Sequence, residues 1–457
     1  MGGGDISHDG QRIALVQYSG ESVELIAVAR NGSRRERVTP LSPAYVYTSP
    51  RWSPDDRSIA IQRLNISNQF NVSLEIVQVS GGERREVTRS EWLRGFSWLP
   101  DGSGLVYSSS RGSTILYPPV FNVRVVGRDG CGDRQLTFGD LSYVEPDVHQ
   151  SGRLLVSRIR GQSDVWQFPV GGSAAENTRD AVRITRQTGQ AQTPSISPDG
   201  TEVVYLSDNG GHGNLWIART DGSSVRQITF ERDPDVVLGV PMWSPSGDWI
   251  VFIVAPSGLT SLWAICPDGS GLHQLTARGW SACWSGDGRW VYYTSERDGI
   301  QQIEKVPAEG GTPILVRSHA ASGALTRDGE TLYHVHPPRS DRLGSVWEVE
   351  MCSAAIGGGS SSIMARISSA RVPLRRDLFQ PFLSPDGRWL AAPLTDGATS
   401  NVWLWPTSGE PMRALTDFGD RPITIARSVS WSGDSRHLYA AVAETESDVV
   451  LWDGLLP

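Results

Sequence analysis

Ile196-Ser197-Pro198-Asp199-Gly200 is the clearest copy of a phrase that recurs ten times in this chain of 457 residues. Each copy begins with a hydrophobic residue, continues with variants of Ser, Pro or Gly, Asp and Gly, and is followed by an alternating strand pattern. The copies end at residues 10, 56, 102, 152, 200, 247, 288, 329, 387 and 435, so successive copies lie 41 to 58 residues apart. A repeat of this length is typical of one four-stranded propeller blade.

The residues around this copy predict the strands of one blade. Pro198 presets the second position of a turn, Asp199 tolerates the third, and Gly200 accepts the positive φ of the fourth. Strands are predicted over 193–197, 202–207, 215–219 and 225–229. We therefore expect each unit to be a meander of four antiparallel strands whose faces are covered by neighbouring units.

The predicted fold class is all-β: a β-propeller of four-stranded antiparallel blades with about ten repeat units. The continuous spacing favours a single large ring, and two rings in tandem are the alternative. The last unit has the pattern of only three strands, from which we expect its fourth strand to come from residues upstream of Met1 in a longer protein. The units span residues 5–39, 49–88, 95–137, 146–185, 193–229, 240–276, 281–317, 323–375, 380–416 and 428–457.

The stretches 382–391, 401–404 and 413–416 together resemble the WD-like repeat of the TolB β-propeller family. The same repeat occurs in the propellers of prolyl oligopeptidase-type peptidases, and in the carboxyl-terminal regions of bacterial serine/threonine kinases and winged-helix regulators. Residues 415–432 resemble this last group most. The resemblance covers almost the whole chain and implies a propeller that serves as a bacterial binding or sensing module, detached from a signalling protein.

The composition of the chain limits the kinds of partner that it can bind. The net charge of −8 argues against nucleic acid, because that partner needs a basic face to replace its counterions. No stretch approaches the roughly 18 apolar residues of a membrane span, so we expect no membrane insertion by this chain. Its expected location is either the cytoplasm or the periplasm of a bacterium. The four cysteines lie far apart and form no Cys-x-x-Cys pair, which predicts neither a disulfide nor a zinc framework.

No catalytic residue, cofactor or metal is predicted. The chain lacks the Gly-x-Ser-x-Gly nucleophile elbow and the Gly-x-x-x-x-Gly-Lys phosphate loop. His334 and His336 alternate along a predicted strand and point the same way, which is how a metal site can begin, but partly buried strand histidines are the simpler interpretation. The alternative function, a metal-dependent carbohydrate-active enzyme of lyase or hydrolase type, depends on such a cluster.

Ligand binding is predicted on the face where each blade has its long connections, those after the second and fourth strands. Variable loops on a rigid frame often carry recognition, and aromatic and Arg side chains are frequent anchors. We expect a protein, peptide or glycan partner there, bound without catalysis. The candidate residues are Tyr47, Trp92, Arg94, Tyr117, Tyr143, Asp147, His212, Arg297 and Arg421.

Overall fold

The computed structural model is built almost entirely of strands. It describes residues 3–20, 22–65, 72–115, 119–186, 189–256, 259–336, 348–368, 371 and 379–454. Within these residues the strands β1 to β37 follow one another, with the helix α1 (Ala174–Arg179) between β14 and β15. None of the described helical residues form a segment long and apolar enough to cross a membrane. The prediction of an all-β fold of four-stranded antiparallel sheets is confirmed.

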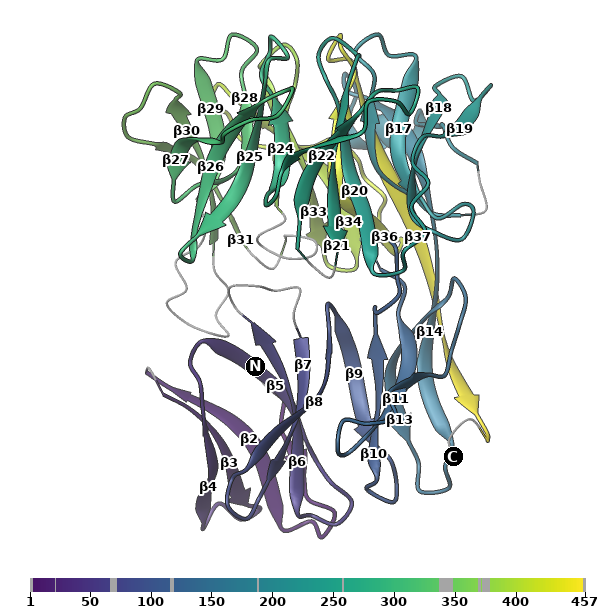
Figure 1. The fold of residues 1–457 in the computed structure, drawn as a ribbon, viewed down its shortest axis with the longest axis vertical. Coiled ribbons are helices and arrows are strands. Elements are labelled where there is room, and N and C mark those ends of the chain that lie inside the picture. Colours follow the sequence, from purple (N-terminus) through teal and green to yellow (C-terminus); the bar gives the residue numbers. More distant parts are fainter. Residues whose placement is uncertain are drawn as a thin grey trace.

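Three sheets of four consecutive strands form most of a lower layer (Figure 1). Each sheet contacts the next, through β1 and β5 and then through β8 and β11. In chain order the strands are β1 (Asp5–Ile6), β2 (Arg12–Ser19), β3 (Ser22–Ala29), β4 (Arg35–Leu41), β5 (Tyr45–Trp52), β6 (Ser58–Asn65), β7 (Val72–Gln78), β8 (Arg84–Ser90), β9 (Leu93–Trp98), β10 (Gly104–Ser109), β11 (Asn122–Gly127) and β12 (Arg134–Gln135).

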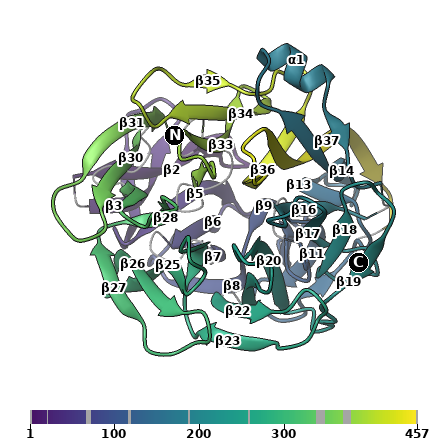
Figure 2. The same cartoon turned by 90° about the horizontal axis from the view of Figure 1, so that it is seen from above.

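Five further sheets of four consecutive strands belong to an upper layer, arranged around a common centre (Figure 2). They are β16 (Ala191–Ile196), β17 (Glu202–Ser207), β18 (Asn214–Arg219) and β19 (Val225–Gln227); β20 (Val236–Trp243), β21 (Ile250–Pro256), β22 (Ser261–Ile265) and β23 (His273–Thr276); β24 (Trp280–Trp284), β25 (Trp290–Arg297), β26 (Ile300–Pro307) and β27 (Ile314–Ser318); β28 (Ala321–Leu325), β29 (Thr331–His336), β30 (Glu348–Ala355) and β31 (Ser362–Ser368); β32 (Phe382–Leu383), β33 (Trp389–Asp396), β34 (Thr399–Pro406) and β35 (Arg413–Ala414).

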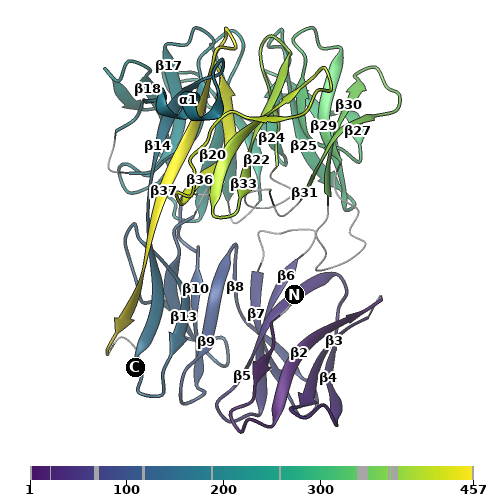
Figure 3. The same cartoon turned by 180° about the vertical axis from the view of Figure 1, so that it is seen from behind.

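One sheet belongs to both layers, because two of its strands run through both (Figures 1 and 3). β14 (Leu154–Pro169) pairs with β37 (His437–Trp452) along all 16 residues of each strand. In the lower layer β13 (Ser142–Val148) lies beside the first half of β14. In the upper layer β36 (Ile423–Trp431) lies beside the first half of β37, and β15 (Val182–Arg183) lies beside the second half of β14. The upper half of this sheet contacts the sheets that contain β16 and β32.

This shared sheet corrects three expectations. The units 146–185 and 428–457 form one sheet, so the described chain has nine sheets rather than ten. The last unit is completed by β14 and β15, and not by residues upstream of Met1. The sheets lie in two layers, which differs from the single ring that the spacing favours (Figure 3). The spacing alone conceals this arrangement because β14 and β37 continue straight on where other units have a loop between their second and third strands.

The core is divided among the interfaces between neighbouring sheets. The tryptophan that opens five copies of the phrase is buried in these interfaces, with at most 8% of its surface exposed. These residues are Trp52, Trp98, Trp243, Trp284 and Trp431. Since a single sheet cannot cover such side chains, the burial of this tryptophan ties each sheet to its neighbour.

Hydrogen bonds within the turn explain why the phrase needs both Ser and Asp. The Ser197 hydroxyl donates to Asp199 Oδ1 at 2.5 Å and accepts from the backbone N–H of Glu202 at 3.0 Å. Asp199 Oδ1 also accepts from the backbone N–H of Thr201 at 3.1 Å, and Gly200 has a φ of 75°. The same hydroxyl-to-carboxylate bond is present at Ser7, Ser53, Ser285, Thr326, Ser384 and Ser432.

These bonds predict an acid-sensitive contribution to stability. The hydrogen bond from Ser197 is the main cause that lowers the pKa of Asp199, and the bond from Ser432 does the same for Asp434. A carboxyl group with a lowered pKa in the folded state adds stability above its unfolded pKa and loses this contribution as the pH falls through its folded pKa. The double variant Asp199→Asn/Asp434→Asn is therefore expected to be less stable than the native chain at pH 7, and this deficit should shrink below about pH 4.

Urea unfolding at a series of pH values measures this difference in the free energy of unfolding. Asp248→Asn is the matched control, because Asp248 is exposed and follows the turn glycine instead of occupying the carboxylate position. A deficit that stays constant between pH 7 and pH 3 would show that the charge of these carboxylates does not stabilise the turns.

Candidate functional site

The long connections of the two layers face each other. Gly213 lies between β17 and β18, and its backbone N–H donates to the Thr114 hydroxyl, between β10 and β11, at 2.7 Å. Both connections follow the second strand of their sheet. An added Cβ on Gly213 would lie 2.0 Å from the Thr114 carbonyl oxygen, so the two layers are in direct contact here. The binding face predicted from the sequence is thus divided into two faces that point toward one another, which corrects the expectation of one open face (Figure 1).

Acidic side chains approach one another across this contact. Burial raises the pKa of Glu91 in the lower layer, and the charge of Asp235 in the upper layer raises it further. Burial also raises the pKa of Asp208 in the upper layer, and the charge of Asp140 in the lower layer acts in the same direction. The layers therefore meet beside carboxyl groups that hold a proton more readily than exposed carboxyl groups do.

Three of the predicted binding residues have structural roles in the lower layer. Tyr47 is only 1% exposed and belongs to the core between the first two sheets, so its place in the candidate set is wrong. It lies within β5 rather than in a loop, and the alternation of that strand turns it inward. Tyr143 packs against Trp452 with the ring centres 5.0 Å apart. Asp147 accepts a hydrogen bond from Ser97 at 3.1 Å.

The other described candidates are distributed over both layers. Trp92 is half-buried between β8 and β9, and Arg94 is exposed over the ring of Phe121 at 5.6 Å. One ring nitrogen of His212 lies 2.8 Å from the Asp233 carbonyl oxygen. Arg421 is exposed and pairs with Glu444 at 3.0 Å. Arg297 lines a pocket described below, and Tyr117 lies outside the described residues.

The centre of the upper layer is occupied by polar side chains that the sequence analysis missed. Arg427 on β36 is 4% exposed and donates to the Ser281 hydroxyl on β24 at 3.1 Å. The buried Gln380 donates from Nε2 to the Ala282 carbonyl oxygen at 3.3 Å. These bonds join sheets that are not neighbours in the chain, so side chains cross the centre of the layer. At this level side chains therefore connect the inner strands of different sheets.

A regular backbone feature marks this central position. Thr193, Val240, Ser281, Ser322 and Arg427 all have a positive φ of 46° to 53°, at irregularities in the pairing of the inner strands. Each lies three or four residues before a copy of the phrase. Counting back from the phrase would therefore have found the central residues, whereas the search for long loops did not.

One pocket lies at the long-connection end of the upper layer, between the β20–β23 and β24–β27 sheets. Its volume is about 390 Å³. Arg297, the last residue of β25, and Arg278, between β23 and β24, lie at its wall, and both side chains are exposed. The Tyr293 hydroxyl donates to Glu304 Oε2 at 3.1 Å, and Gln302 Nε2 donates to Glu304 Oε1 at 3.0 Å.

The polar side chains around this pocket are suited to binding a ligand. The Glu304 carboxylate lies 3.9 Å from the Arg297 guanidinium but is only 7% exposed and already accepts bonds from two neighbours. Burial, with the charge of Glu304, raises the pKa of Tyr293, so this hydroxyl stays protonated at neutral pH. The pocket lining contains two cations, the guanidinium groups of Arg278 and Arg297, and also the carboxylates of Glu296, Asp298 and Glu304.

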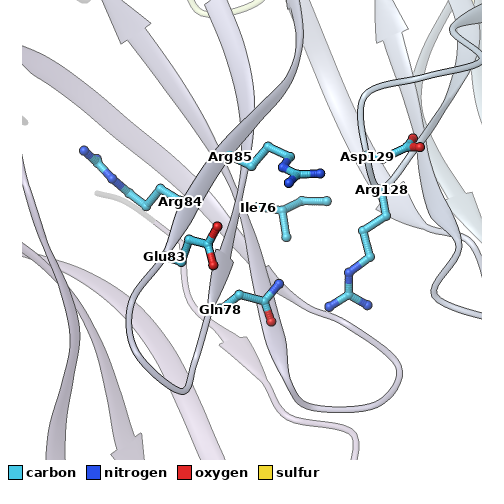
Figure 4. A pocket seen from close by; sticks show the side chains of 7 residues that line it. All are labelled: Ile76, Gln78, Glu83, Arg84, Arg85, Arg128 and Asp129. Carbon is cyan, nitrogen blue, oxygen red and sulfur yellow. The ribbon is translucent and has the colours of Figure 1, made fainter.

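A second pocket, of about 350 Å³, lies at the opposite, short-turn end of the lower layer (Figure 4). Arg84, Arg85 and Arg128 line it together with Ile76, Gln78, Glu83 and Asp129, and Arg84 points away from the other two arginines. Arg128 donates to the Ser58 hydroxyl and lies 5.5 Å from the centre of the Trp98 ring. Arg128 thus already serves the packing of the second sheet against the third.

The chain is similar to several known proteins over parts of its length. An uncharacterised protein of Agrobacterium fabrum is 28% identical over 158 residues, which are 34% of this chain and 49% of that protein. A tricorn protease homologue of Streptomyces coelicolor is 26% identical over 189 residues, 39% of this chain and 16% of that protein. A solved structure described as a TolB protein from Agrobacterium tumefaciens has 18% identity and a TM-score of 0.48, and covers 63% of this chain and 99% of its own.

The chain spans about half the length of the first of these relatives and less of the second. Residues 4–233, which are half of the chain, match the model of the TolB β-propeller domain. This segment contains the first three sheets, the β13–β15 part of the shared sheet and the β16–β19 sheet. The chain belongs to the TolB β-propeller family.

Proposed function

We propose that this chain is a non-catalytic binding module that holds an acidic protein, peptide or glycan at the pocket between the β20–β23 and β24–β27 sheets. The observation that carries the proposal is the pair of exposed guanidinium groups, Arg278 and Arg297, at the wall of a pocket of about 390 Å³. A guanidinium binds a carboxylate through two parallel hydrogen bonds, which gives both affinity and orientation.

The pocket lies at the end of the upper layer that faces the lower layer, so a partner would reach it between the two layers. Arg427 and Gln380 form bonds across the centre of the upper layer, and neither residue lines the pocket. The pocket lies on connections of the rigid frame, where recognition is commonly placed. Its described lining residues include neither histidine nor cysteine, so the alternative of a metal-dependent carbohydrate-active enzyme is not favoured at this site.

Removing the guanidinium groups tests the proposal. We expect the native chain to bind a polyglutamate peptide or a polyuronate oligomer, and not their neutral counterparts, in isothermal titration calorimetry. Arg278→Ala and Arg297→Ala should each weaken this binding about tenfold or more, since a hydrogen bond to a charged group contributes about 1.5–3 kcal/mol.

Arg289→Ala is the matched control for these variants. Arg289 is an exposed arginine of the same sheet, but it lies at the short-turn end and pairs with Asp287 at 2.7 Å. Absence of binding to both acidic probes would contradict the proposal. An equal loss in Arg289→Ala would show a general effect of charge instead of a site.

We further propose that the six sheets of the upper layer act as one closed propeller, and that the module is the sensing part of a longer bacterial signalling protein. The resemblance of residues 415–432 to propellers of kinases and winged-helix regulators supports this role. Sequencing the genomic reading frame around this chain tests it. A kinase or winged-helix domain in the same frame is the expected result, and a frame encoding only further propeller units would contradict it.

A further inference from the structure

Four residues with metal-binding side chains form a block of cross-strand neighbours on β29 and β30 of the β28–β31 sheet. This sheet belongs to the upper layer (Figure 1). His334 and His336 lie two residues apart on β29, and their cross-strand partners on β30 are Cys352 and Glu350. Residues two apart on a strand, and directly paired residues on neighbouring strands, share one face of a sheet. The pairing register therefore places two imidazoles, a thiol and a carboxylate side by side.

The distances within this block are short. One ligand atom each of His334, His336 and Cys352 lies within 4.8 Å of the other two. His336 Nδ1 lies 3.6 Å from Glu350 Oε2, and the two imidazole rings have their centres 5.1 Å apart. Zinc bonds of about 2.1 Å to nitrogen and 2.3 Å to sulfur separate tetrahedral ligand atoms by roughly 3.5 Å. Small side-chain rotations would thus bring the three residues to a common ion.

The inner half of the block is buried and holds an unsatisfied nitrogen. His334 and Cys352 are both 0% exposed, whereas His336 and Glu350 reach the solvent. His334 Nε2 lies 2.9 Å from the Ser361 hydroxyl, but the buried His334 Nδ1 has no hydrogen-bond partner among the described residues. A buried polar atom without a partner costs about 1–3 kcal/mol, so such an atom in a native protein calls for an explanation.

We propose that His334, His336 and Cys352, with Glu350 as the fourth ligand, form a zinc-binding site. A hydrogen bond from Nε2–H of His334 to Ser361 leaves a lone pair on Nδ1, and the metal would satisfy it. Mixed imidazole and thiolate ligands favour Zn²⁺ over Mg²⁺, Ca²⁺ or Mn²⁺, which prefer oxygen. The alternation of His334 and His336 marks two of these ligands in the sequence, but Cys352 is separated from them by a long connection and joins them only through strand pairing.

One oxygen of Glu350 is already engaged, because Oε1 accepts a hydrogen bond from Arg366 Nε at 3.1 Å, whereas Oε2 lies beside His336. Burial, and then the neighbouring His336 and Arg317, lower the pKa of His334 to about 4, so its imidazole is neutral at pH 7 as a metal ligand must be. Burial raises the pKa of Cys352 to about 11, although Arg317 and Arg366 act against this increase. Zinc binding would therefore release the thiol proton to solvent as the Zn–S bond forms, and the thiolate and the Glu350 carboxylate balance the two charges of the ion.

A zinc ion here would stabilise the outer part of the β28–β31 sheet. Ser361 precedes β31 and accepts a hydrogen bond at 3.2 Å from Arg317, which lies on β27 of the neighbouring sheet. The ion would thus connect two strands and, through Ser361, the adjoining sheet. Four protein ligands leave no open position for a substrate, so the site is structural in type. It is independent of the acidic ligand proposed for the Arg278 and Arg297 pocket.

Cobalt substitution provides the direct test. After chelator treatment, the full chain is expected to bind one Co²⁺ with the visible bands of a tetrahedral ion and a near-ultraviolet thiolate-to-cobalt band, and Zn²⁺ should remove both signals at one equivalent. Cys352→Ser should abolish the thiolate band. His336→Gln, at a partly exposed position, should weaken zinc affinity about 100-fold or more, beyond the 10-fold to 100-fold loss typical of residues outside the ligand set.

Cys131→Ser and His149→Gln are the matched controls, because both residues are exposed and lie in the lower layer. Circular dichroism checks that each variant is folded. If Cys352→Ser does not fold, the zinc affinity of His336→Gln still tests the proposal. A native chain that shows no thiolate band overturns the proposal. The same holds if His336→Gln binds zinc as tightly as the native chain, or if several ions bind equally well to all variants, which would indicate adventitious binding only.

Discussion

Replacing both Val450 and Trp452 by alanine is expected to destabilise the lower layer by about 3–5 kcal/mol. Both residues lie on the second half of β37 and pack against the cluster between the third sheet and the shared sheet. This cluster contains the fully buried Val106, Val123 and Leu154. Losing two large apolar side chains there removes contacts and leaves space that the sheet cannot fill. Differential scanning calorimetry should show the transition of the lower layer moving to a lower temperature.

The same strand provides a matched control for this effect. Val449 and Leu451 alternate with the two packed residues and point to the other face of the sheet, where they are 69% and 53% exposed. Val449→Ala/Leu451→Ala also truncates two apolar side chains of this strand, although Leu is smaller than Trp, and is expected to cost less than about 1 kcal/mol. If both double variants melt at the same temperature, the second half of β37 does not pack against the lower layer.

Gly213→Ala is expected to loosen the contact between the layers and to cost about 1–3 kcal/mol or more. The new methyl group would lie 2.0 Å from the Thr114 carbonyl oxygen and 2.9 Å from its carbonyl carbon. Because these atoms belong to the backbone, a side-chain rotation cannot relieve the overlap. Amide hydrogen exchange should become faster around residues 113–115 and 208–214, where the two connections meet.

Gly171→Ala serves as the control for this substitution. Nothing lies within 4 Å of an added Cβ at Gly171, and its φ is not in the left-handed range. The stability of this variant is expected to stay within about 0.5 kcal/mol of the native value. Unchanged exchange in Gly213→Ala would contradict direct contact between Gly213 and Thr114.

The sequence predicts the sheets well because the phrase around Ser197, Asp199 and Gly200 encodes its own turn. The Ser-to-Asp hydrogen bond and the positive φ of glycine are local, so they can be recognised without knowing what packs nearby. The joining of units 146–185 and 428–457 depends instead on pairing between residues almost 300 positions apart. No local pattern in β14 or β37 distinguishes a strand that continues into a second layer from two shorter strands.

The candidate site is predicted less well for a related reason. Arg297 was chosen as a loop residue and does line a pocket, whereas Tyr47 was chosen by the same criterion and is buried. Residue type and loop length do not reveal inward or outward orientation near the end of a strand. The pairing of Cys352 with His334 likewise depends on the register between β29 and β30, which the sequence does not specify.

Disulfide trapping tests the central claim, that β14 and β37 pair continuously through both layers. Arg158 and Asp448 are cross-strand partners in the lower layer, with their side chains 2.8 Å apart, and a cross-strand pair has the separation that a disulfide needs. Mild oxidation of Arg158→Cys/Asp448→Cys should give a 158–448 cross-link in peptide mass spectrometry, whereas Arg158→Cys/Glu444→Cys, four residues out of register, should not. A folded 158/448 variant that stays reduced, or equal cross-linking of both pairs, would contradict the shared strands.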